Sequence, residues 1–541
     1  MKKLFTLAAF ALASLNMMAT DYKDNLQIEI NGKVVSNDPS TISVDPQDNG
    51  KYTLSLKNFQ FKMGVLPMKV GNIIITDVPG VSNGVNTMIK TSQEITITAG
   101  DSGKGWIGPG LGKVPVNMVG EIRENTFYTI ININMASLNQ QIKVTFGTDG
   151  YQIPNSDFEE FHNEKGQTTK LNEETGEYDK IDFDIPEPNH WHSFGSATGG
   201  LVSVVKMNKQ SDMSEDVREG ATGKKCAKVV SALEFGSIPA NGTLTTGQLQ
   251  ASGFTPDSPL NCAFLDLTNE ERDTNGDPFY VTLNAKPDSV KFWVRFKQGT
   301  LENPEYKYAS FNAVLTDGTR YQDPQDPAET YKNIVGMATD KTIDSKEFTW
   351  HEVVVPFDYE TYKTNGATPK AILVTISTNS VPGAASTDAE NPDELYVDDL
   401  SLVYNAGLKS VKFKGENVDI NEKIKEGTVM NAGSYNLNDF VVEANGAGAY
   451  VTKELVDVYD PDFDETTTEL HITVTSGDLQ TENKYIVNIN GGTPTGIKSI
   501  TLPNGVQAIY NINGQKVSNM VPGQVYIVKT TDGKTKKFIK K

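Results

Sequence analysis

Apolar and polar side chains alternate with a period of two through almost the whole chain beyond residue 20, in short runs separated by turns rich in Gly, Asn, Asp and Pro. Successive side chains of a β-strand point to opposite faces, so this alternation is typical of half-buried strands, whereas an amphipathic helix needs a period of about 3.6 residues. Clear examples are Leu26-Gln-Ile-Glu-Ile, Tyr52-Thr-Leu-Ser-Leu and Gln141-Ile-Lys-Val-Thr-Phe. The sequence therefore predicts an all-β protein. Its 541 residues exceed what one hydrophobic core can hold, so we expect about three to four domains.

Residues 1–19 are predicted to be a secretory signal peptide. Lys2 and Lys3 form a basic start, Leu4 to Leu15 form a short apolar run, and small residues lead to a cleavage position near Ala19. The run is too short to span a bilayer as a mature helix, and no cysteine lies at the boundary to carry a lipid. We therefore expect a bacterial protein that passes through the periplasm and is secreted or held at the outer cell surface.

The charge balance excludes several classes of partner. Lys and Arg total 49 against 69 Asp and Glu, a formal net charge of −20, and removal of Lys2 and Lys3 with the signal peptide takes it to −22. An acidic surface repels phosphate backbones and anionic lipids, which disfavours nucleic acid and membrane-surface binding. No later apolar run reaches membrane-spanning length, so we expect no membrane span.

Cys226 and Cys262 are the two cysteines of the chain. Export to an oxidising compartment permits a disulfide between them. Each also stands in an apolar stretch, which suits a small buried thiol. Both interpretations stay open from the sequence.

Residues 20–149 contain about eight short strands at even spacing, a number and spacing typical of a small closed barrel. The segment resembles the calycin-like β-barrel domain of exported bacterial proteins. The resemblance is carried by Tyr52-Thr-Leu-Ser-Leu-Lys-Asn-Phe, Val70-Gly-Asn-Ile, Trp106-Ile-Gly-Pro, Val114-Pro-Val and Ile142-Lys-Val-Thr-Phe-Gly. Barrels of this type either hold a ligand or are filled with side chains, and the sequence does not choose between the two.

Residues 150–405 form a second, larger unit. It begins with Tyr151-Gln-Ile-Pro-Asn-Ser-Asp-Phe-Glu and ends with Leu395-Tyr-Val-Asp-Asp-Leu-Ser-Leu-Val-Tyr. Between them stand, in order, Gly223-Lys-Lys-Cys-Ala, Pro239-Ala-Asn-Gly-Thr-Leu-Thr-Thr-Gly, Gly276-Asp-Pro-Phe, Lys291-Phe-Trp-Val-Arg-Phe and Val354-Val-Pro-Phe-Asp-Tyr. These pieces resemble the PCMD family, jelly-roll domains named for carbohydrate metabolism and found in secreted proteins of glycan-degrading Gram-negative bacteria. The resemblance implies a two-sheet sandwich and a link to carbohydrate, and supplies no catalytic residues.

Two further segments complete the expected organisation. Residues 406–491 have the strand count and length of a small immunoglobulin-like β-sandwich, which usually acts as a spacer. Residues 492–541 contain a Gly- and Pro-containing linker and a tail that is similar to a short C-terminal sorting domain of the type IX secretion system. That resemblance implies a secretion machinery as partner and no ligand site in the tail.

The candidate glycan site lies on two strands of the second unit. Trp293 and Arg295 occupy the polar face of a strand over residues 290–297, and Tyr308 and Asn312 occupy the polar face of residues 306–316. If the strands pair, one sheet face carries all four. A pyranose can stack its C–H face on an aromatic ring while polar side chains meet its hydroxyls. The alternative is that another sheet or a long loop covers this face.

The candidate metal is a structural Ca²⁺ between the first and last strands of the second unit. Its oxygen ligands would come from Asn155, Asp157 and Glu159 at the start and from Asp398 and Asp399 at the end, with Glu159 and Asp399 preferred. The alternative is that Asp157 caps a turn and the late pair is solvated.

The segment His190-Trp191-His192 contains a possible metal pair. Pro186, Pro188 and Asn189 precede it, and we expect a surface loop in which Trp191 offers an aromatic edge to a ligand. Since the chain has only five histidines and no third one nearby, the sequence disfavours zinc.

The sequence favours a non-catalytic extracellular protein that binds carbohydrate. The first alternative is a structural or adhesive surface protein without a glycan site, and the second is an unrecognised glycoside hydrolase. Hydrolysis needs two carboxylates at a controlled separation, and nothing in the sequence marks a pair such as Glu270 and Glu271, or Asp323 and Asp326.

Overall fold

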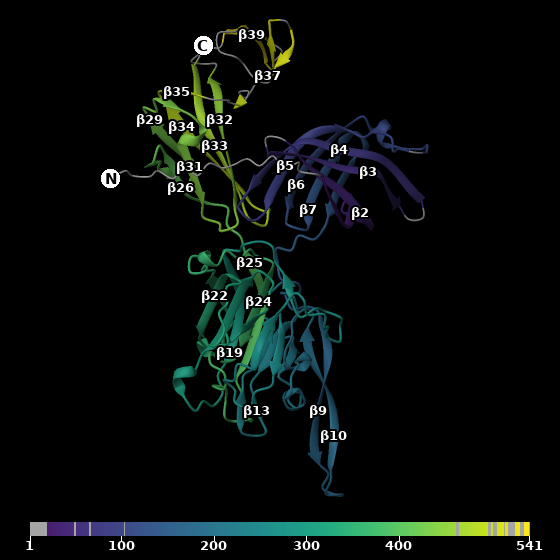
Figure 1. The fold of residues 1–541 in the computed structure, drawn as a ribbon, viewed down its shortest axis with the longest axis vertical. Coiled ribbons are helices and arrows are strands. Elements are labelled where there is room, and N and C mark those ends of the chain that lie inside the picture. The colour runs from purple at the N-terminus through teal and green to yellow at the C-terminus, as the bar shows by residue number, and fades with distance from the viewer. Residues whose placement is uncertain are drawn as a thin grey trace, which may run out of the picture. The chain divides into compact units, whose positions relative to one another are not determined.

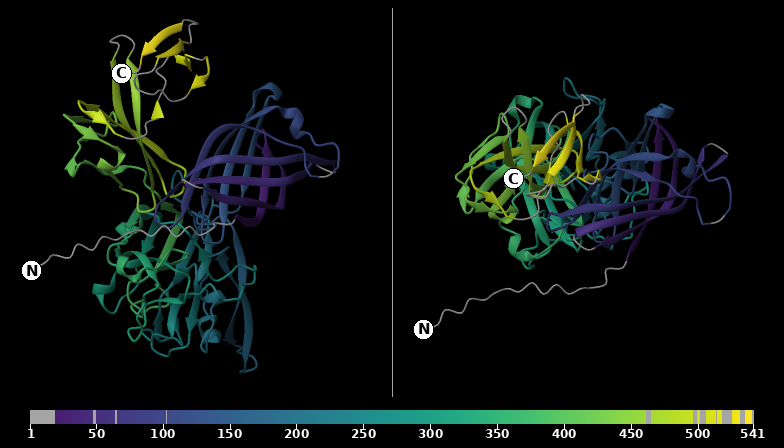
Figure 2. Two further views of the ribbon diagram at one scale, coloured as in Figure 1. Left: turned by 45° about the horizontal axis from the view of Figure 1, so that its top comes forward. Right: turned by 90° about the horizontal axis from the view of Figure 1, so that it is seen from above.

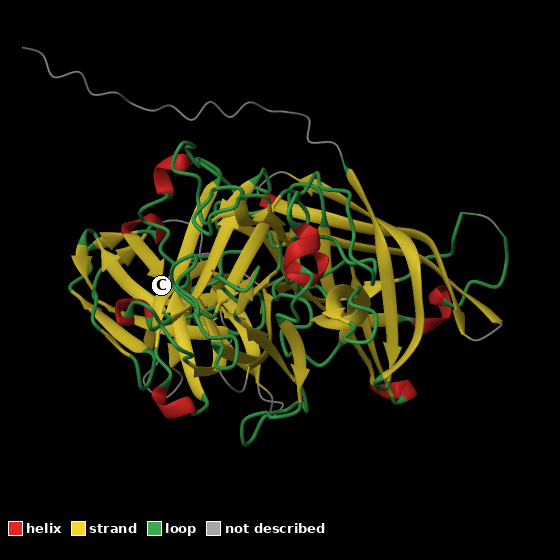
Figure 3. Ribbon diagram, turned by 90° about the horizontal axis from the view of Figure 1, so that it is seen from below, coloured by secondary structure: helices red, strands yellow, loops and turns green. Residues whose placement is uncertain are grey.

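The computed structural model describes residues 19–47, 50–63, 66–101, 103–460, 465–495, 499–500, 506–512, 514–517, 525–530 and 535–539. The predicted signal peptide lies outside the described residues except for its last position. Strands joined by a few very short helices make up the described chain, which confirms the all-β prediction (Figure 3). Among these residues no helix has the length and apolar character needed to cross a bilayer. The chain forms two compact units that divide after Asp149.

The first unit is a closed antiparallel barrel in which each strand pairs with the next and the first pairs with the last (Figures 1 and 2). Alternate side chains point inward, so Leu26 and Ile28 of one strand and Phe146 of its partner are all buried in the interior core. The expected eight-stranded barrel is therefore confirmed. Its strands are β1 (Thr20–Ile30), β2 (Lys33–Gln47), β3 (Lys51–Met63), β4 (Leu66–Ser82), β5 (Thr87–Thr96), β6 (Lys113–Ile122), β7 (Phe127–Met135) and β8 (Gln140–Phe146).

Residues 150–405 of the second unit contain two antiparallel sheets that pack face to face (Figure 1). Phe292 and Phe311 stack with their ring centroids 4.5 Å apart, and both are fully buried, so this contact lies between the inner faces. The β19 sheet has the order β11 (Ser211–Ser214), β12 (Cys226–Val230), β25 (Glu394–Val403), β19 (Ser289–Lys297) and β23 (His351–Pro356). The β20 sheet has the order β15 (Thr243–Thr245), β24 (Ala371–Ser377), β20 (Ala309–Thr316) and β22 (Ile334–Ile343), with β18 (Val281–Thr282) also on β24.

The strands of residues 290–297 and 306–316 do not pair with each other, so the condition for one face carrying all four candidate glycan residues is not met. β19 pairs with β23 and β25, whereas β20 pairs with β22 and β24. The two strands present the same alternation of apolar and polar residues, and that pattern cannot distinguish neighbours in one sheet from partners across a sandwich. Trp293 and Arg295 therefore lie on the outer face of one sheet, and Asn312 lies on the outer face of the other.

Smaller elements surround the β20 sheet. A three-stranded sheet of β16 (Gln248–Ala251), β17 (Asn261–Leu265) and β21 (Tyr321–Asp323) covers part of its outer face. There Leu249, Leu265 and Tyr321 share one buried cluster with Val314 and Leu373 of the β20 sheet. Two antiparallel ribbons complete the region, β9 (Phe161–Leu171) with β10 (Tyr178–Pro188) and β13 (Ala232–Glu234) with β14 (Ile238–Ala240), together with η4 (Phe194–Ser196) and α1 (Val202–Val205).

Residues 406–495, together with residues 499–500, build a further pair of sheets around a core of their own, in which Phe440, Leu470 and Val487 are fully buried. One sheet is β27 (Glu416–Asn417), β26 (Leu408–Phe413) and β31 (Phe440–Ala444). The other is β28 (Ile420–Asn421), β29 (Glu426–Met430), β34 (Glu482–Asn490), β33 (Glu465–Thr475), β32 (Tyr450–Asp460) and β36 (Ser499–Ile500). β29 runs parallel to β34. The immunoglobulin-like assignment stays a prediction.

The described parts of the tail contain one four-stranded sheet, in the order β38 (Lys516–Val517), β37 (Val506–Asn511), β39 (Val525–Thr530) and β40 (Thr535–Ile539). Several segments of the tail lie outside the described residues, and its role as a sorting signal stays a prediction.

Cys226 and Cys262 are both buried free thiols. Cys226 lies on β12 of the β19 sheet and Cys262 on β17 of the three-stranded sheet. Of the two possibilities left by the sequence, the structure has the pair of buried thiols.

Removing the phenyl ring of Phe311 leaves a void between the inner faces of the two sheets. We expect Phe311→Ala to lower the free energy of unfolding by about 3–5 kcal/mol, because the lost transfer energy adds to the energy of an unfilled cavity. Lys291→Ala, on the outer face of β19, is the matched control and should change stability by less than about 0.5 kcal/mol. Urea unfolding curves of the two variants would measure the difference, and equal midpoints would contradict the assignment of the inner faces.

Candidate functional site

A cavity of about 650 Å³ lies over the outer face of the β20 sheet. Its walls come from the β13–β14 ribbon, the three-stranded sheet and the segment that follows β24. This volume falls within the range of about 300–1,000 Å³ that is typical of small-molecule sites. The cavity exists because the three-stranded sheet covers only part of that outer face and leaves the rest open.

The floor of the cavity consists of short polar side chains in register across neighbouring strands. Asn312 of β20 lies opposite Thr375 of β24 and Thr339 of β22, and the Thr339 hydroxyl donates a hydrogen bond of 2.7 Å to Asn312 Oδ1. One step along the strands, Ser310 lies opposite Ser377. All five line the cavity. Since alternate residues of a strand share a face, the burial of Phe311 inside the sandwich places these side chains outside it.

Two exposed phenyl rings stand among the lining residues. Phe254, in the loop between β16 and β17, is 75% exposed, and Phe235, in the turn between β13 and β14, is 65% exposed. Large apolar side chains left in water beside a cavity are informative, because the hydrophobic effect normally buries them. The cavity therefore combines aromatic faces with a polar floor.

Two carboxyl groups also line the cavity. Burial raises the pKa of Glu234 to about 7, and only the Asn208 amide opposes the rise by donating a hydrogen bond of 3.1 Å to Oε2. Burial likewise raises the pKa of Asp323, while the side chains of Asn312 and Thr375 beside it act in the opposite direction. Glu234 Oε1 is buried and has no hydrogen-bond partner. Low-dielectric surroundings favour the neutral acid, so these two groups hold protons at a higher pH than ordinary surface acids.

Of the four residues predicted to bind a ligand together, only Asn312 lines this cavity. Trp293 is half-buried on the outer face of the β19 sheet. The Arg218 guanidinium lies over its ring, 4.7 Å from the centroid, and also pairs with the Asp399 carboxylate. Tyr308 is half-buried just before β20 and lies outside the lining. The predicted common surface is therefore absent from the described residues.

Arg295 is enclosed by aromatic rings. Its guanidinium lies 4.5 Å from the ring centroid of Phe348, 5.5 Å from that of Trp350 and 4.4 Å from that of Tyr396. An ion pair of 2.6 Å with Asp216 completes its surroundings, and 12% of the side chain remains exposed. Since both the faces and the charge of the guanidinium have partners within the protein, Arg295 holds the outer face of the β19 sheet together.

Several of the residues predicted to bind calcium already have protein partners. Glu159 Oε1 accepts hydrogen bonds from the backbone N–H groups of Lys224 (2.8 Å) and Lys225 (2.9 Å). Asp398 keeps one buried oxygen without a partner, and its burial together with the neighbouring Asp399 charge raises its pKa to about 7.

The other two predicted calcium ligands, Asn155 and Asp157, add little further evidence for an ion. Asn155 accepts a hydrogen bond from the Glu160 backbone N–H (3.0 Å) and donates to two backbone carbonyls, and Asp157 is exposed. The start and end of the unit meet through a backbone hydrogen bond of 2.8 Å from the Leu400 N–H to the Ser156 carbonyl. A calcium ion at this position stays a prediction.

The expectation of a surface loop at residues 190–192 is wrong. Trp191 and His192 are completely buried. The Trp191 ring packs against Phe158 with centroids 5.1 Å apart, and its Nε1 donates a hydrogen bond of 3.2 Å to the Pro154 carbonyl. Trp191 therefore cannot offer an edge to a ligand, because the long-range packing of the preceding segment covers it.

Sequence reasoning missed Phe235, Phe254 and Glu234. The cavity joins residues from 194 to 383, and no local periodicity reports such a meeting of distant segments. One usable signal was present: each phenylalanine stands in a turn-forming context, Glu-Phe235-Gly and Gly-Phe254-Thr-Pro, where a buried ring is unexpected.

A family model described as the calycin-like beta-barrel domain matches residues 18–149. This match agrees with the closed eight-stranded barrel of the first unit. No curated protein matches the chain.

Two solved structures show a low similarity to part of the chain, and both are named in provisional terms as glycoside hydrolases. One, from Bacteroides thetaiotaomicron VPI-5482, has 14% identity and a TM-score of 0.29 and covers 54% of this chain and 87% of its own. The other, from Bacteroides vulgatus ATCC 8482, has 15% identity and a TM-score of 0.25 and covers 45% of this chain and 97% of its own. At these TM-scores neither likeness carries an argument about function.

Replacing Glu234 by Gln removes the carboxyl whose pKa burial raises to about 7. An unfolded glutamate titrates at about pH 4.3, so between about pH 4.3 and 7 the folded state keeps a proton that the unfolded state has released, and wild-type stability falls as the pH rises through this window. We expect Glu234→Gln to be more stable than the wild type at pH 8 by about 1–2 kcal/mol, and no more stable at pH 4. Urea unfolding at both pH values would measure this, and a difference that does not depend on pH would contradict it.

Proposed function

We propose that residues 150–405 bind a glycan in the cavity over the β20 sheet, and that the protein acts outside the cell as a carbohydrate-binding or glycan-utilisation-associated protein. The observation that carries the proposal is the combination of exposed Phe254 and Phe235 rings with a floor of hydroxyl and amide groups in one cavity. A pyranose has apolar C–H faces and a rim of hydroxyls, and this lining complements both. The resemblance of the segment to the PCMD family supports the same class of ligand.

Export is part of the proposal. It rests on the signal peptide predicted for residues 1–19 and on the resemblance of residues 492–541 to a type IX sorting tail, both of which lie partly or wholly outside the described residues. The calycin-like barrel and the sandwich of residues 406–495 are given no glycan site in this proposal.

Truncating Phe254 tests the cavity directly. Since 75% of this residue is exposed, its removal should leave the fold intact, and loss of a stacking face should weaken glycan binding by about tenfold. The measurement is isothermal titration of the mature protein against a panel of soluble glycans, first with the wild type and then with Phe254→Ala and Asn312→Ala.

Trp293→Ala is the matched control, because it truncates a half-buried aromatic on the outer face of the other sheet. We expect its affinity to equal that of the wild type. If Trp293→Ala loses binding while Phe254→Ala keeps it, the cavity proposal is wrong and the ligand site lies on the β19 sheet, as the sequence predicted. If the wild type binds no glycan saturably, a structural or adhesive role is favoured instead.

A second candidate function, glycoside hydrolysis, has one specific observation in its favour. Glu234 and Asp323 line the same cavity, and burial raises the pKa of Glu234 to about 7, as a general acid requires. Hydrolysis of a glycosidic bond requires a protonated carboxyl as general acid and a second carboxylate as base or nucleophile.

If this candidate is correct, Glu234→Gln and Asp323→Asn should each lower the rate of reducing-sugar release by at least about 100-fold while glycan binding persists. Glu270→Gln, an exposed acid outside the cavity lining, is the control and should keep the wild-type rate. Absence of turnover by the wild type on every glycan that it binds would eliminate the hydrolase.

A further inference from the structure

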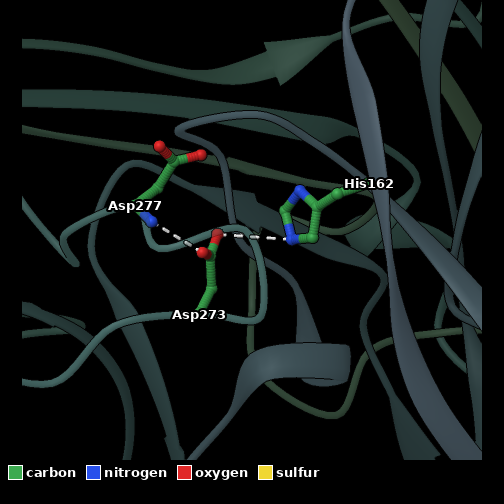
Figure 4. A group of neighbouring side chains, drawn as sticks. All are labelled: His162, Asp273 and Asp277. Atoms are coloured by element: carbon green, nitrogen blue, oxygen red, sulfur yellow. Dashed lines mark hydrogen bonds and ion pairs between the residues drawn. The ribbon is translucent and has the colours of Figure 1, made fainter.

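A cluster of buried histidine and carboxylate side chains lies at the base of the β9–β10 ribbon. His162 of β9 is directly opposite Glu187 of β10, and Glu164 is two residues further along the same face of β9. His192 follows after the ribbon, and Asp273 comes from a turn more than 80 residues later in the chain. Figure 4 shows Asp273 pointing toward the His162 ring, with Asp277 beside it.

Each of four side chains in this cluster has one polar atom held by the protein and another that has no hydrogen-bond partner and is buried. The unpartnered atoms are His162 Nε2, His192 Nδ1, Asp273 Oδ2 and Glu187 Oε2. The side chains of His192, Asp273 and Glu187 are 0% exposed, and that of His162 is 9% exposed. Four orphaned atoms in one buried place are unusual, because an unpartnered buried polar group costs about 1–3 kcal/mol.

The partnered atoms orient the histidine rings. His162 Nδ1 lies 3.1 Å from Asn189 Oδ1, and His192 Nε2 lies 3.3 Å from the Pro278 carbonyl oxygen. Because a carbonyl oxygen can only accept, each ring carries a proton on that nitrogen, and the neutral form of the ring then leaves a lone pair on His162 Nε2 and on His192 Nδ1. Histidines that bind metals are held in this way by a hydrogen bond from the other ring nitrogen.

The carboxylates are oriented in the same manner. Asp273 Oδ1 accepts a hydrogen bond of 2.8 Å from the Asp277 backbone N–H. Glu187 Oε1 accepts from the backbone N–H groups of Ser193 (2.8 Å) and Ser196 (3.1 Å). Asp273 Oδ2 and Glu187 Oε2 are thus held in place without donors of their own.

His162 Nε2 and a carboxylate oxygen from each of Glu164 and Glu187 are close enough to bind one ion, since the three ligand atoms all lie within 4.8 Å of one another. His162 Nε2 lies 3.2 Å from Asp273 Oδ2, 3.6 Å from Glu164 Oε1 and 4.0 Å from Glu187 Oε2, and His192 Nδ1 lies 3.6 Å from Asp273 Oδ2. Ligands about 2.0–2.2 Å from a tetrahedral Zn²⁺ are about 3.3–3.6 Å apart. Lone pairs that face one another at these distances repel unless a proton or a metal ion lies between them.

From this arrangement we infer that the base of the β9–β10 ribbon binds a first-row divalent metal ion, with Zn²⁺ the best fit, through His162 Nε2 and a carboxylate oxygen from each of Glu164 and Glu187. Mixed imidazole and carboxylate donors suit zinc, whereas calcium takes oxygen ligands. Asp277 lies outside this set, since one of its oxygens accepts hydrogen bonds from the His190 N–H and Asn275 and the other pairs with the His190 ring.

The ion has a structural role. It joins β9, which carries His162 and Glu164, to β10, which carries Glu187. The same Glu187 carboxylate holds the backbone of η4, whose Phe194 lines the cavity. The metal site is nevertheless independent of what the cavity binds.

The test uses the mature full-length protein, loaded with Zn²⁺ and desalted. We expect about one zinc ion per chain by elemental analysis. Removal of the ion with EDTA should lower the midpoint of thermal unfolding by at least about 5 °C, and Zn²⁺ should restore it while Ca²⁺ at the same concentration does not. Co²⁺ loading should produce visible d–d absorption bands.

Substitutions of the ligand residues and of a neighbouring residue test where the ion binds. Glu187→Gln and His162→Gln should lose zinc binding, and His190→Gln, a partly exposed neighbour outside the ligand set, should keep full stoichiometry. Wild-type protein without bound zinc, with a melting midpoint insensitive to EDTA, would overturn the proposal and leave a cluster held by a shared proton. Full zinc binding by folded His162→Gln would also overturn it. If both ligand variants fail to fold, the wild-type Co²⁺ spectrum decides, and absence of bands refutes the site.

Discussion

The contact between Phe292 and Phe311 expresses the constraint on which the architecture of residues 150–405 depends. Once these rings meet between the sheets, the strict alternation of each strand sends every second side chain outward. The outward residues of β19 and β20 then belong to opposite surfaces of the sandwich. The faces by which the two sheets pack therefore determine which polar residues share a surface.

The outer faces of the two sheets differ in the contacts that their polar and aromatic side chains make. On the β19 sheet, the Arg218 guanidinium lies over Trp293 and that of Arg295 lies over Tyr396. Arg218 also pairs with Asp399, and Arg295 pairs with Asp216. Cation–π contacts and ion pairs within the protein hold that surface together, while the Nε atoms of both arginines stay without a hydrogen-bond partner. On the β20 sheet, Asn312 and its neighbours remain at the bottom of a cavity, beside two phenyl rings that water still reaches.

Whether a buried polar atom has a hydrogen-bond partner distinguishes the structural residues from the functional candidates. Glu159 and Asn155 were attractive metal ligands by type, yet backbone groups already bond to them. His192 was expected in a surface loop and His162 was not singled out by the sequence, yet each keeps a buried nitrogen without a partner. Because an orphaned buried atom is costly, its presence indicates a ligand more strongly than residue type does.

The sequence by itself determined the all-β class, the closed barrel of the first unit and which residues of each strand face together, because strand periodicity is a local property of the backbone. It also placed Asn312 on a polar face, which proved to be the floor of the cavity. Only the tertiary structure decided which strands became neighbours and which loops covered which face. It buried Trp191 and His192, separated Trp293 from Asn312, and brought Asp273 to His162 across 111 residues. Such meetings depend on the packing of whole sheets, and the alternation of apolar and polar residues is the same whichever sheet a strand joins.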